Sequence, residues 1–350
     1  MEKKWVVKDL IHDDIAQKLA GSLNIELILA RLLVQRGVKS FPEAKDFFRP
    51  SMDNLHNPFL IKDMDLAILR IEKAIANKER ILVYGDYDVD GTTAVALVWS
   101  FLKEFYENVE HYIPDRYKEG YGVSFESIDY AHDKGITLVI ALDCGIKAFS
   151  QVEYANSKGI DFIICDHHRP AETLPAAIAI VDPKREDCSY HYKELSGCGL
   201  GFKLAQAYYQ KNRLPFEKLE RFLDLVMLSI AADIVPVTGE NRILAYYGLQ
   251  RLNKLPRPGL ESILFYGNVI KNKFPSDTTV FSREITINDA IFLIGPRINA
   301  AGRIERGGAS VDLLLCERLE DTHRLSESIN NNNNERRHLD TETTRQAVEI

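Results

Sequence analysis

Short apolar runs that each stop at an aspartate are the feature that most constrains the fold of this chain. ILVYG is followed by Asp86, LVIAL by Asp143, FIIC by Asp166 and IAIV by Asp182. Segments with helical periodicity lie between these runs, as in TTAVALVWSFLKEFY. Strands that alternate with helices predict an α/β fold with a mostly parallel sheet and helices on both faces.

The aspartates at the strand ends predict a binding site. We expect strands at residues 81–85, 109–113, 136–142, 161–165 and 176–181. In an open α/β sheet, ligands bind outside the carboxyl ends of the strands. Asp88 and Asp90 share a loop with Asp86, so these acids would converge with Asp143 on one crevice. Because carboxylates at close range repel one another, a pair of divalent cations is the simplest way to hold them together.

The rest of the chain is predicted to be helical. Residues 1–60 form an N-terminal helical segment, 61–240 the α/β domain, 241–318 a helical extension and 319–350 a connecting helix. No glycine or proline follows Ala309, and the last segment has no stop signal, so we expect it to lead into a further domain. The run Asn330 to Asn334 is a poor helix former and marks a place where this helix could break.

Composition indicates an ordinary globular protein. The 350 residues are 45% hydrophobic and 27% charged. No stretch approaches the roughly 20 apolar residues of a membrane span, and the N-terminus lacks the apolar core of a signal peptide. Five cysteines without paired spacing favour free thiols, so we expect a cytoplasmic protein that does not contact the membrane. The net charge of −7 argues against a basic nucleic-acid surface, although cations at an acid cluster would change that sign locally.

The types of donor narrow the choice of metal. Aspartates together with His167, without a thiolate, disfavour structural zinc and favour Mn²⁺, with Mg²⁺ as the alternative. Two such ions about 3.5–4 Å apart can clamp a phosphoryl group and activate a water molecule. The residues therefore predict phosphoester hydrolysis.

Each of these residues also has a simpler interpretation. An aspartate after a strand is often a helix N-cap, and Asp182 before Pro183 is better explained as a turn residue. A calcium-binding loop that began at Asp86 would need glutamate where Leu97 stands. His167 and His168 are adjacent, so in an extended segment one side chain could bind metal while the other faces a substrate or packs.

Four segments resemble, in order, the metal motifs of the DHH phosphodiesterase superfamily. They are GDYDVDGTTA (85–94), ALDCGI (141–146), CDHHRP (165–170) and AADIVPV (231–237). Three more are similar to the RecJ-type single-strand-specific exonucleases within it: YIPDRYKEGYGVS (112–124), LSGCGLGFKLAQA (195–207) and GPRINAAGRI (295–304). Tyr84 stands where pyrophosphatases and small-oligonucleotide enzymes of the superfamily usually have a histidine.

The resemblance implies a two-metal site. One ion would bind four side chains: Asp90, Asp143, His167 and Asp233. The second would bind Asp88 and Asp143, with Asp86 in place of the missing histidine. Asp166 would orient the histidine pair, and His168 would contact the scissile phosphate.

The resemblance also implies residues that contact DNA. The predicted substrate-binding side chains are Arg297, Asn299 and Arg303 in GPRINAAGR, and Arg116 and Tyr121 in the glycine-rich loop. Arginine suits phosphate, and tyrosine can stack on a base. A solvated loop with surface charges is the simpler interpretation. Gly197, Gly199 and Gly201 could cradle an anion or allow close packing.

The function implied by the resemblance is Mn²⁺-dependent 5′→3′ hydrolysis of single-stranded DNA to 5′-mononucleotides, in DNA repair and recombination. Single-stranded DNA is the expected partner, together with a single-strand-binding protein or a helicase. A phosphodiesterase for short oligonucleotides or cyclic dinucleotides is one alternative, and a non-catalytic scaffold is another. The second catalytic domain and OB fold of RecJ-type enzymes are absent from this sequence, so we expect it to hold metals but to degrade DNA poorly or not at all.

Overall fold

The computed structural model describes residues 4, 6, 13–304 and 308–349, with the side chains of 301–304 and 349 excepted. Contacts divide the chain into two units, Met1–Leu55 and His56–Ile350. The finer boundaries expected at residues 240 and 318 remain predictions.

The first unit is helical, as its sequence predicts. Its helices are α1 (Asp13–Leu23), α2 (Leu27–Gln35) and α3 (Phe41–Phe48), followed by the short 3₁₀-helix η1 (Met52–Asn54). They enclose a small core that includes Ala16, Leu19, Ala30, Leu33 and Ala44. α3 begins with a capping box, in which the Ser40 side chain accepts from the Glu43 backbone and the Glu43 carboxylate accepts from the Ser40 backbone.

The second unit is built on a parallel sheet. Its strands are β1 (Arg80–Gly85), β2 (Val109–Tyr112), β3 (Ile136–Leu142), β4 (Asp161–Cys165) and β5 (Ala179–Val181). The strand order is β2-β1-β3-β4-β5, and every neighbouring pair is parallel. All five expected strands are therefore confirmed, although β5 begins three residues later than the apolar run suggests.

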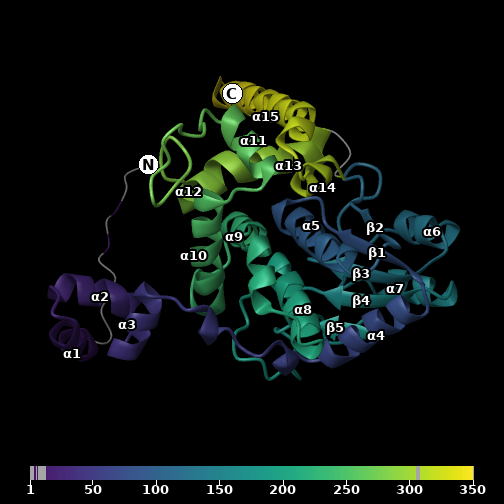
Figure 1. Cartoon of the computed structure of the whole chain (residues 1–350), viewed down its shortest axis with the longest axis horizontal. Helices are drawn as coiled ribbons and strands as arrows, with labels where there is room; N and C mark the ends of the chain where they lie inside the picture. Colours follow the sequence, from purple (N-terminus) through teal and green to yellow (C-terminus); the bar gives the residue numbers. More distant parts are fainter. Residues whose placement is uncertain (1–3, 5, 7–12, 305–307, 350) are drawn as a thin grey trace. The chain divides into compact units, whose positions relative to one another are not determined.

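Helices cover both faces of this sheet (Figure 1). On one face, α6 (Phe125–Asp133) and α7 (Phe149–Ser157) contact β3 and β4 over a core that includes Leu82, Val139 and Phe162. On the other face, α5 (Val89–Lys103) contacts β1, β2 and β3, and α8 (Gly197–Lys211) contacts β3 and β4. α4 (Met64–Ala76), which follows the 3₁₀-helix η2 (Pro58–Leu60), packs against α8 and β5. The predicted α/β class is confirmed.

Beyond α8 the described chain is largely helical. The elements are η3 (Phe216–Phe222), α9 (Leu223–Ala232), α10 (Gly239–Lys254), α11 (Pro258–Tyr266), α12 (Ile287–Asp289), the π-helix η4 (Ala290–Ile294), α13 (Gly295–Ile304), α14 (Gly308–Leu315) and α15 (Leu319–Glu349). The apolar helix α9 is buried and contacts α5, α8 and α10. These contacts bring the C-terminal end of α9 to the same edge of the sheet as the strand ends.

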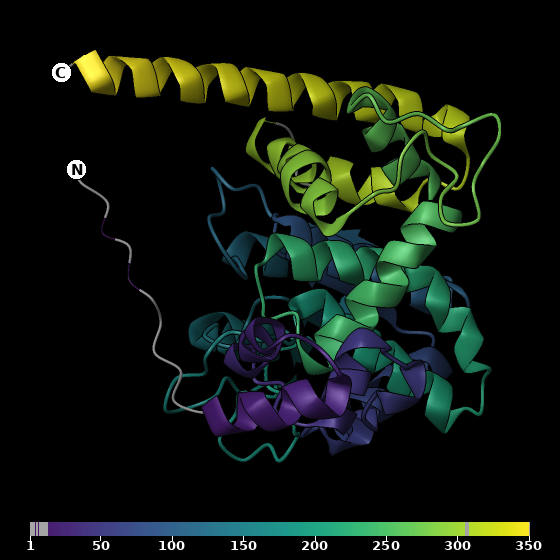
Figure 2. The ribbon, with the colours of Figure 1, turned by 90° about the vertical axis from the view of Figure 1, so that its left-hand side faces the viewer.

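The expected break at Asn330 to Asn334 is wrong. α15 runs unbroken from Leu319 to Glu349, as Figure 2 shows, and the interruption lies at residues 316–318. Asn333 is buried, and the Asn330 side-chain oxygen accepts a hydrogen bond from Arg297 in α13 at 3.2 Å. These contacts with α13 override the low helix propensity of asparagine.

No helix among the described residues has the length and apolar character that a membrane crossing requires. The cytoplasmic location remains a prediction.

Candidate metal centre

The loop between β1 and α5 carries three of the predicted ligands. Asp86 directly follows β1, Asp88 is the N-cap of α5, and Asp90 lies in the first turn of that helix. Asp88 Oδ1 accepts the Gly91 N–H at 3.0 Å, so the N-cap interpretation is correct for one of its two oxygens. A Cβ on Gly91 would lie 2.3 Å from the Asp86 carbonyl oxygen. The loop can therefore fold this tightly only with glycine at position 91.

Asp90 is held by donors from two other helices. The backbone N–H groups of Gly197 and Cys198, in the first turn of α8, each donate to its carboxylate at 2.7 Å. The Ser229 hydroxyl of α9 donates to the same carboxylate at 2.7 Å. The glycine-rich segment thus does bind an anion, and that anion is the protein's own Asp90.

Asp143 sits at a sharp turn after β3. Its φ of 58° lies in the left-handed region, which aspartate tolerates better than most residues. Its backbone N–H donates to the Cys165 carbonyl at 2.9 Å, and its side chain exposes only 3% of its surface. A Cβ on Gly197 would lie 2.5 Å from the Asp143 Cβ. Gly197 therefore allows α8 to lie against this carboxylate.

Asp233 ends helix α9 beside a strained residue. Asp233 is the C-cap of the helix, and the following Ile234 has a φ of 59° with 85% of its surface exposed. A β-branched residue at positive φ is costly, and such strain concentrates at functional sites. Here it turns the chain directly after a predicted ligand.

The carboxylates converge on His167. Its Nε2 lies 3.1 Å from Asp143 Oδ1, 3.5 Å from Asp233 Oδ2 and 3.6 Å from Asp90 Oδ2. These contacts are short but do not have the geometry of hydrogen bonds. In the described part of the chain, neither ring nitrogen of His167 has a hydrogen-bond partner, and Asp143 Oδ1 has none either. Donor atoms gathered without bonds to one another are the arrangement expected around a shared cation.

Within the described residues, two groups of side chains have donor atoms close enough to hold a metal ion. One group is Asp90, His167 and Asp233, and the other is Asp143, His167 and His168. In each group the donor atoms all lie within 4.8 Å of one another. Asp86 and Asp88 belong to neither group, although Asp86 Oδ1 is buried without a partner among the described residues. The ligand set of a second ion therefore remains a prediction.

Asp166 holds the ring of His168, which belongs to the second of these groups. His168 Nδ1 lies 2.7 Å from Asp166 Oδ1, which also accepts the His168 backbone N–H at 3.0 Å. The Ile146 N–H donates to the other Asp166 oxygen at 2.9 Å. Burial acts to raise the pKa of Asp166, but the bonds from His168 and Ile146 outweigh it and lower that pKa. The same hydrogen bond raises the pKa of His168, so Asp166 favours a charged His168 with a fixed ring.

Asp86, Asp143 and Asp233 are destabilised as anions. Burial, with repulsion from Asp88, raises the pKa of Asp86 to about 7. Burial and the charge of Asp90 raise the pKa of Asp233 to about 7 and that of Asp143 well above its usual range. A bound divalent cation would reverse both effects. The unpartnered oxygens and this mutual repulsion fit a metal centre.

The glycine-rich loop after β2 lies beside His168. The Tyr121 hydroxyl is 3.4 Å from His168 Nε2, and the Arg116 guanidinium lies over the Tyr87 ring at 5.0 Å. A cavity of about 200 Å³ opens here, lined by residues that include Tyr121, Lys147 and His168. The structure therefore brings both predicted loop residues close to the acid cluster.

Helix α13, with the sequence GPRINAAGRI, lies near the same cluster, and its Arg297 side chain already has partners within the protein. A Cβ on Gly295 would lie 3.7 Å from Ala232 Cβ and 3.9 Å from Val89 Cγ2, and these residues adjoin predicted ligands. Arg297 donates to the Leu293 carbonyl at 2.8 Å and to Asn330, so it fixes α13 on α15. Asn299 Oδ1 is buried without a partner among the described residues. The Arg303 side chain lies outside the described residues.

Sequence reasoning missed Ser229 and Ser196 as supports of the site. Ser229 donates to Asp90, and its hydroxyl oxygen lies 2.6 Å from that of Ser196, the N-cap of α8. One signal was present, because Ser229 is the only polar residue in the run LVMLSIAA (225–232). A lone hydroxyl in a buried helix needs a partner.

Comparisons with known proteins find a matching family model and relatives of similar sequence. Residues 80–230 match the model of the DHH family, N-terminal domain. The chain is 36% identical over 347 residues to the single-stranded-DNA-specific exonuclease RecJ of Bacillus subtilis, covering 99% of this chain and 42% of that protein. It is 33% identical over 324 residues to RecJ of Escherichia coli, covering 89% of this chain and 54% of that protein.

A crystal structure of exonuclease RecJ bound to manganese is similar in fold. The TM-score is 0.71 at 29% identity, covering 82% of this chain and 69% of that one. The chain spans about half the length of the curated relatives it matches.

Proposed function

Because the chain belongs to the DHH family, we propose that it hydrolyses phosphodiester bonds in single-stranded DNA from the 5′ end, releasing 5′-mononucleotides, with Mn²⁺ as its cofactor. The observation that carries the proposal is the convergence of Asp90, Asp143 and Asp233 on His167, with buried donor atoms left unpaired in the described residues. The similarity to RecJ proteins supports the choice of DNA as substrate.

The proposed ligands divide between two ions. Asp90, Asp143, His167 and Asp233 would hold one, and Asp86, Asp88 and Asp143 the other. When bound, divalent cations at this site would neutralise the carboxylates, polarise a phosphate and lower the pKa of a coordinated water. Mn²⁺ suits a mixture of carboxylates and imidazole, and Mg²⁺ is the alternative.

The residues around the cluster would position the scissile phosphate. His168 Nδ1 is bonded to Asp166, so Nε2 can donate a hydrogen bond to a phosphate oxygen as negative charge develops there. Tyr121 and Arg116 lie on the same side and would hold the strand end in the adjoining cavity. Asn299, with its unpartnered buried oxygen, and the arginines Arg297 and Arg303 of α13 would guide the backbone.

Tyr84 argues against the alternative enzyme, a phosphodiesterase for short oligonucleotides or cyclic dinucleotides. The Tyr84 side chain is buried, and its hydroxyl donates to the Gly122 carbonyl at 2.7 Å. A histidine ligand at this position, as in small-oligonucleotide enzymes, would require the glycine-rich loop to repack.

A single-strand-binding protein or a helicase remains the partner that we expect, since either would supply single strands.

The test is the release of mononucleotides from a 5′-labelled 30-nucleotide single strand in Mn²⁺, with the same strand in a duplex, a dinucleotide and a cyclic dinucleotide as comparisons. We expect weak but measurable release of labelled 5′-mononucleotide from the single strand, and no release by the Asp143→Asn variant. Cleavage of the dinucleotides alone would assign the chain to the alternative enzyme class. Binding of the strand without turnover, unaffected by Asp143→Asn, would identify a scaffold.

A further inference from the structure

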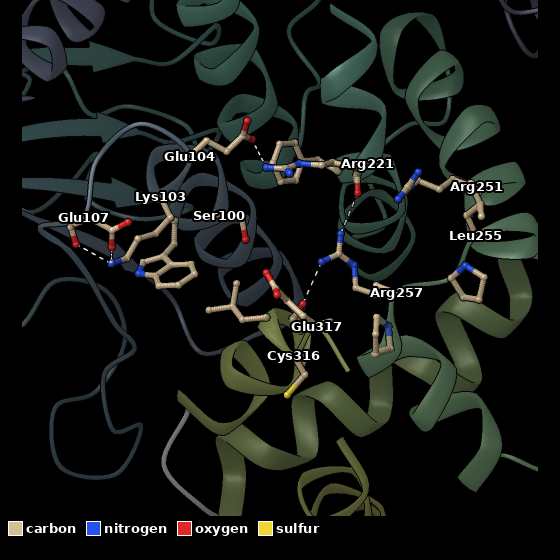
Figure 3. Close-up of a pocket in the computed structure, with 16 residues that line it drawn as sticks. Ser100, Lys103, Glu104, Glu107, Arg221, Arg251, Leu255, Arg257, Cys316 and Glu317 are labelled. Carbon is tan, nitrogen blue, oxygen red and sulfur yellow. Dashed lines mark hydrogen bonds and ion pairs between the residues drawn. The ribbon is translucent and has the colours of Figure 1, made fainter. Parts of the chain in front are cut away.

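A second cavity lies at the opposite end of α5 from the acid cluster. It has a volume of about 770 Å³ and is lined by residues of α5, η3, α10, α11, α14 and the link from α14 to α15 (Figure 3). α5 has 15 residues, so its two ends are separated by about 22 Å at 1.5 Å per residue. The cavity is therefore distinct from the proposed site of hydrolysis.

Three of the four cations that line this cavity are already neutralised. Lys103 Nζ lies 3.3 Å from the Glu107 carboxylate, and Arg221 pairs with Glu104. Arg257 binds the buried Asp224 through two hydrogen bonds, of 2.8 and 2.7 Å. These three pairs leave no net positive charge for a ligand.

Arg251 is the exception. It forms no ion pair with a carboxylate in the described part of the chain, and its buried Nε has no hydrogen-bond partner there. Burial lowers the pKa of Arg251, which reflects the cost of holding this charge without a partner. Figure 3 shows its guanidinium directed towards Arg221 and Arg257, inside the group of lining side chains. A guanidinium that lines a cavity and has no carboxylate partner in the described part of the chain can take an anion from outside the chain.

The lining also sets the charge and polarity of that anion. Glu317 lines the cavity without an ion pair in the described part of the chain, so a ligand with many negative charges would be repelled. The remaining lining is largely apolar: Trp99, Phe222, Leu255, Pro256, Pro258 and Leu314. The volume falls within the roughly 300–1,000 Å³ of small-molecule sites. A small ligand with one negative charge on an apolar body fits the charge, the apolar lining and the volume of this cavity.

We propose that this cavity binds a small organic monocarboxylate with an apolar body. Arg251 receives the carboxylate through its two terminal Nη groups, because the flat guanidinium fork matches two carboxylate oxygens. Trp99 forms the apolar wall, and its ring is fixed by a 3.2 Å hydrogen bond from Nε1 to the Val109 carbonyl. This site is independent of the proposed hydrolysis, and its test does not rest on that activity.

Trp99 provides the measurement. The chain has two tryptophans, so in a Trp5→Phe background the fluorescence of Trp99 reports on the cavity alone. The probes are 4-phenylbutyrate, its neutral amide 4-phenylbutyramide, thymidylyl-thymidine as a monoanionic phosphodiester, and a thymidine decanucleotide. EDTA in the buffer keeps the oligonucleotides intact. We expect saturable binding of 4-phenylbutyrate at least about tenfold tighter than that of its amide, the discrimination typical of a charged hydrogen bond.

Two variants separate the role of Arg251 from a general effect of charge. Arg251→Met should weaken 4-phenylbutyrate about tenfold or more and leave the amide unchanged. Arg221→Met combined with Glu104→Gln removes a lining ion pair and leaves the net charge of the cavity unchanged, so the affinity should change by less than about threefold. Circular dichroism and thermal melting confirm that each variant is folded. Equal binding of acid and amide, no effect of Arg251→Met, or tighter binding of either thymidine probe would each overturn the proposal.

Discussion

The two ends of helix α5 both gather charge, but they compensate it in different ways. At the N-terminal end, Asp86 Oδ1 and Asp143 Oδ1 are buried without hydrogen-bond partners in the described residues, and His167 lies among carboxylates to which it is not bonded. At the C-terminal end, three of the four cations that line the cavity pair with a carboxylate, and Arg251 pairs with none in the part of the chain that the structure describes.

The difference indicates what each end requires from outside. Several anions in mutual repulsion can be stabilised only by concentrated positive charge, which divalent cations provide. One spare guanidinium among neutral pairs needs no more than one anion. Charge compensation within the chain therefore distinguishes a metal centre from a cavity for a singly charged ligand, and the following changes test that contrast.

The largest effect is expected from Asp143→Ala. Asp143 is shared by both proposed ions and lies 3.1 Å from His167 Nε2, so its loss removes a ligand from each site. Loss of a residue that only supports a ligand costs about 10–100-fold in metal affinity, and loss of the ligand itself should exceed this. Isothermal titration with Mn²⁺ measures the change. Asp182→Asn is the matched control, because this strand-end aspartate accepts the Lys184 N–H and is in neither metal-binding group. Equal losses of Mn²⁺ affinity in both variants would contradict the assignment of Asp143 as a ligand.

Gly197→Ala should have the next largest effect. The added Cβ would lie 2.5 Å from the Asp143 Cβ, so either Asp143 or the start of α8 must move. We expect Mn²⁺ affinity to fall about 10–100-fold, as for the loss of a supporting residue. In Gly199→Ala, the added Cβ would meet Ser196 Oγ at 3.2 Å, and the affinity should change far less. If both variants bind Mn²⁺ as the wild type does, Gly197 has no positioning role.

The metal-free protein should lose stability as the pH rises. Burial and neighbouring carboxylates raise the pKa of Asp86 and of Asp233 from 3.8 to about 7 in the folded state. Between about pH 4 and pH 7 the folded state therefore binds more protons than the unfolded state, so this contribution to stability falls as the pH rises. Thermal melting in EDTA at pH 5 and pH 8 measures it, and Asp233→Asn should reduce the difference by a few degrees. A pH dependence that is unchanged in this variant would show that Asp233 is not destabilised as an anion.

The smallest effect is expected from Ser229→Ala. The change removes one of three donors to Asp90 and leaves the two backbone N–H groups of α8 in place. We expect a loss of about 1 kcal/mol in the free energy of unfolding, the usual worth of one hydrogen bond, with a small fall in Mn²⁺ affinity. Ser262→Ala removes another buried hydroxyl, one without a partner among the described residues, and should cost less. Chemical denaturation compares the two, and a larger loss for Ser262→Ala would refute the role of Ser229.

The sheet could be predicted because its signals are local. Each strand is a short apolar run with its own end, and the run at 136–142 coincides with β3 residue for residue. The break expected at Asn330 to Asn334 failed because the asparagine propensity is local, whereas the contact of Asn330 with Arg297 is not. Local pattern fixes the existence of an element, and contacts across the fold decide where it ends.

The composition of the acid cluster could also be predicted, but its supports could not. The strand-end rule brings Asp143 and Asp90 together without knowledge of the structure. The bonds from Gly197 and Ser229 to Asp90 join residues more than a hundred positions apart, and no periodicity or spacing encodes such pairs. Arg251 lies on a helix without a motif, and the sequence does not show which arginines lack a partner, so this residue could be identified only from the structure.

The most direct test of the central claim is X-ray diffraction from crystals soaked in Mn²⁺, with the anomalous signal measured at the manganese edge. The account predicts two peaks about 3.5–4 Å apart at the carboxyl edge of the sheet, one of them among Asp90, Asp143, His167 and Asp233. An absence of anomalous density among these side chains, in crystals that bind Mn²⁺ elsewhere, would contradict it.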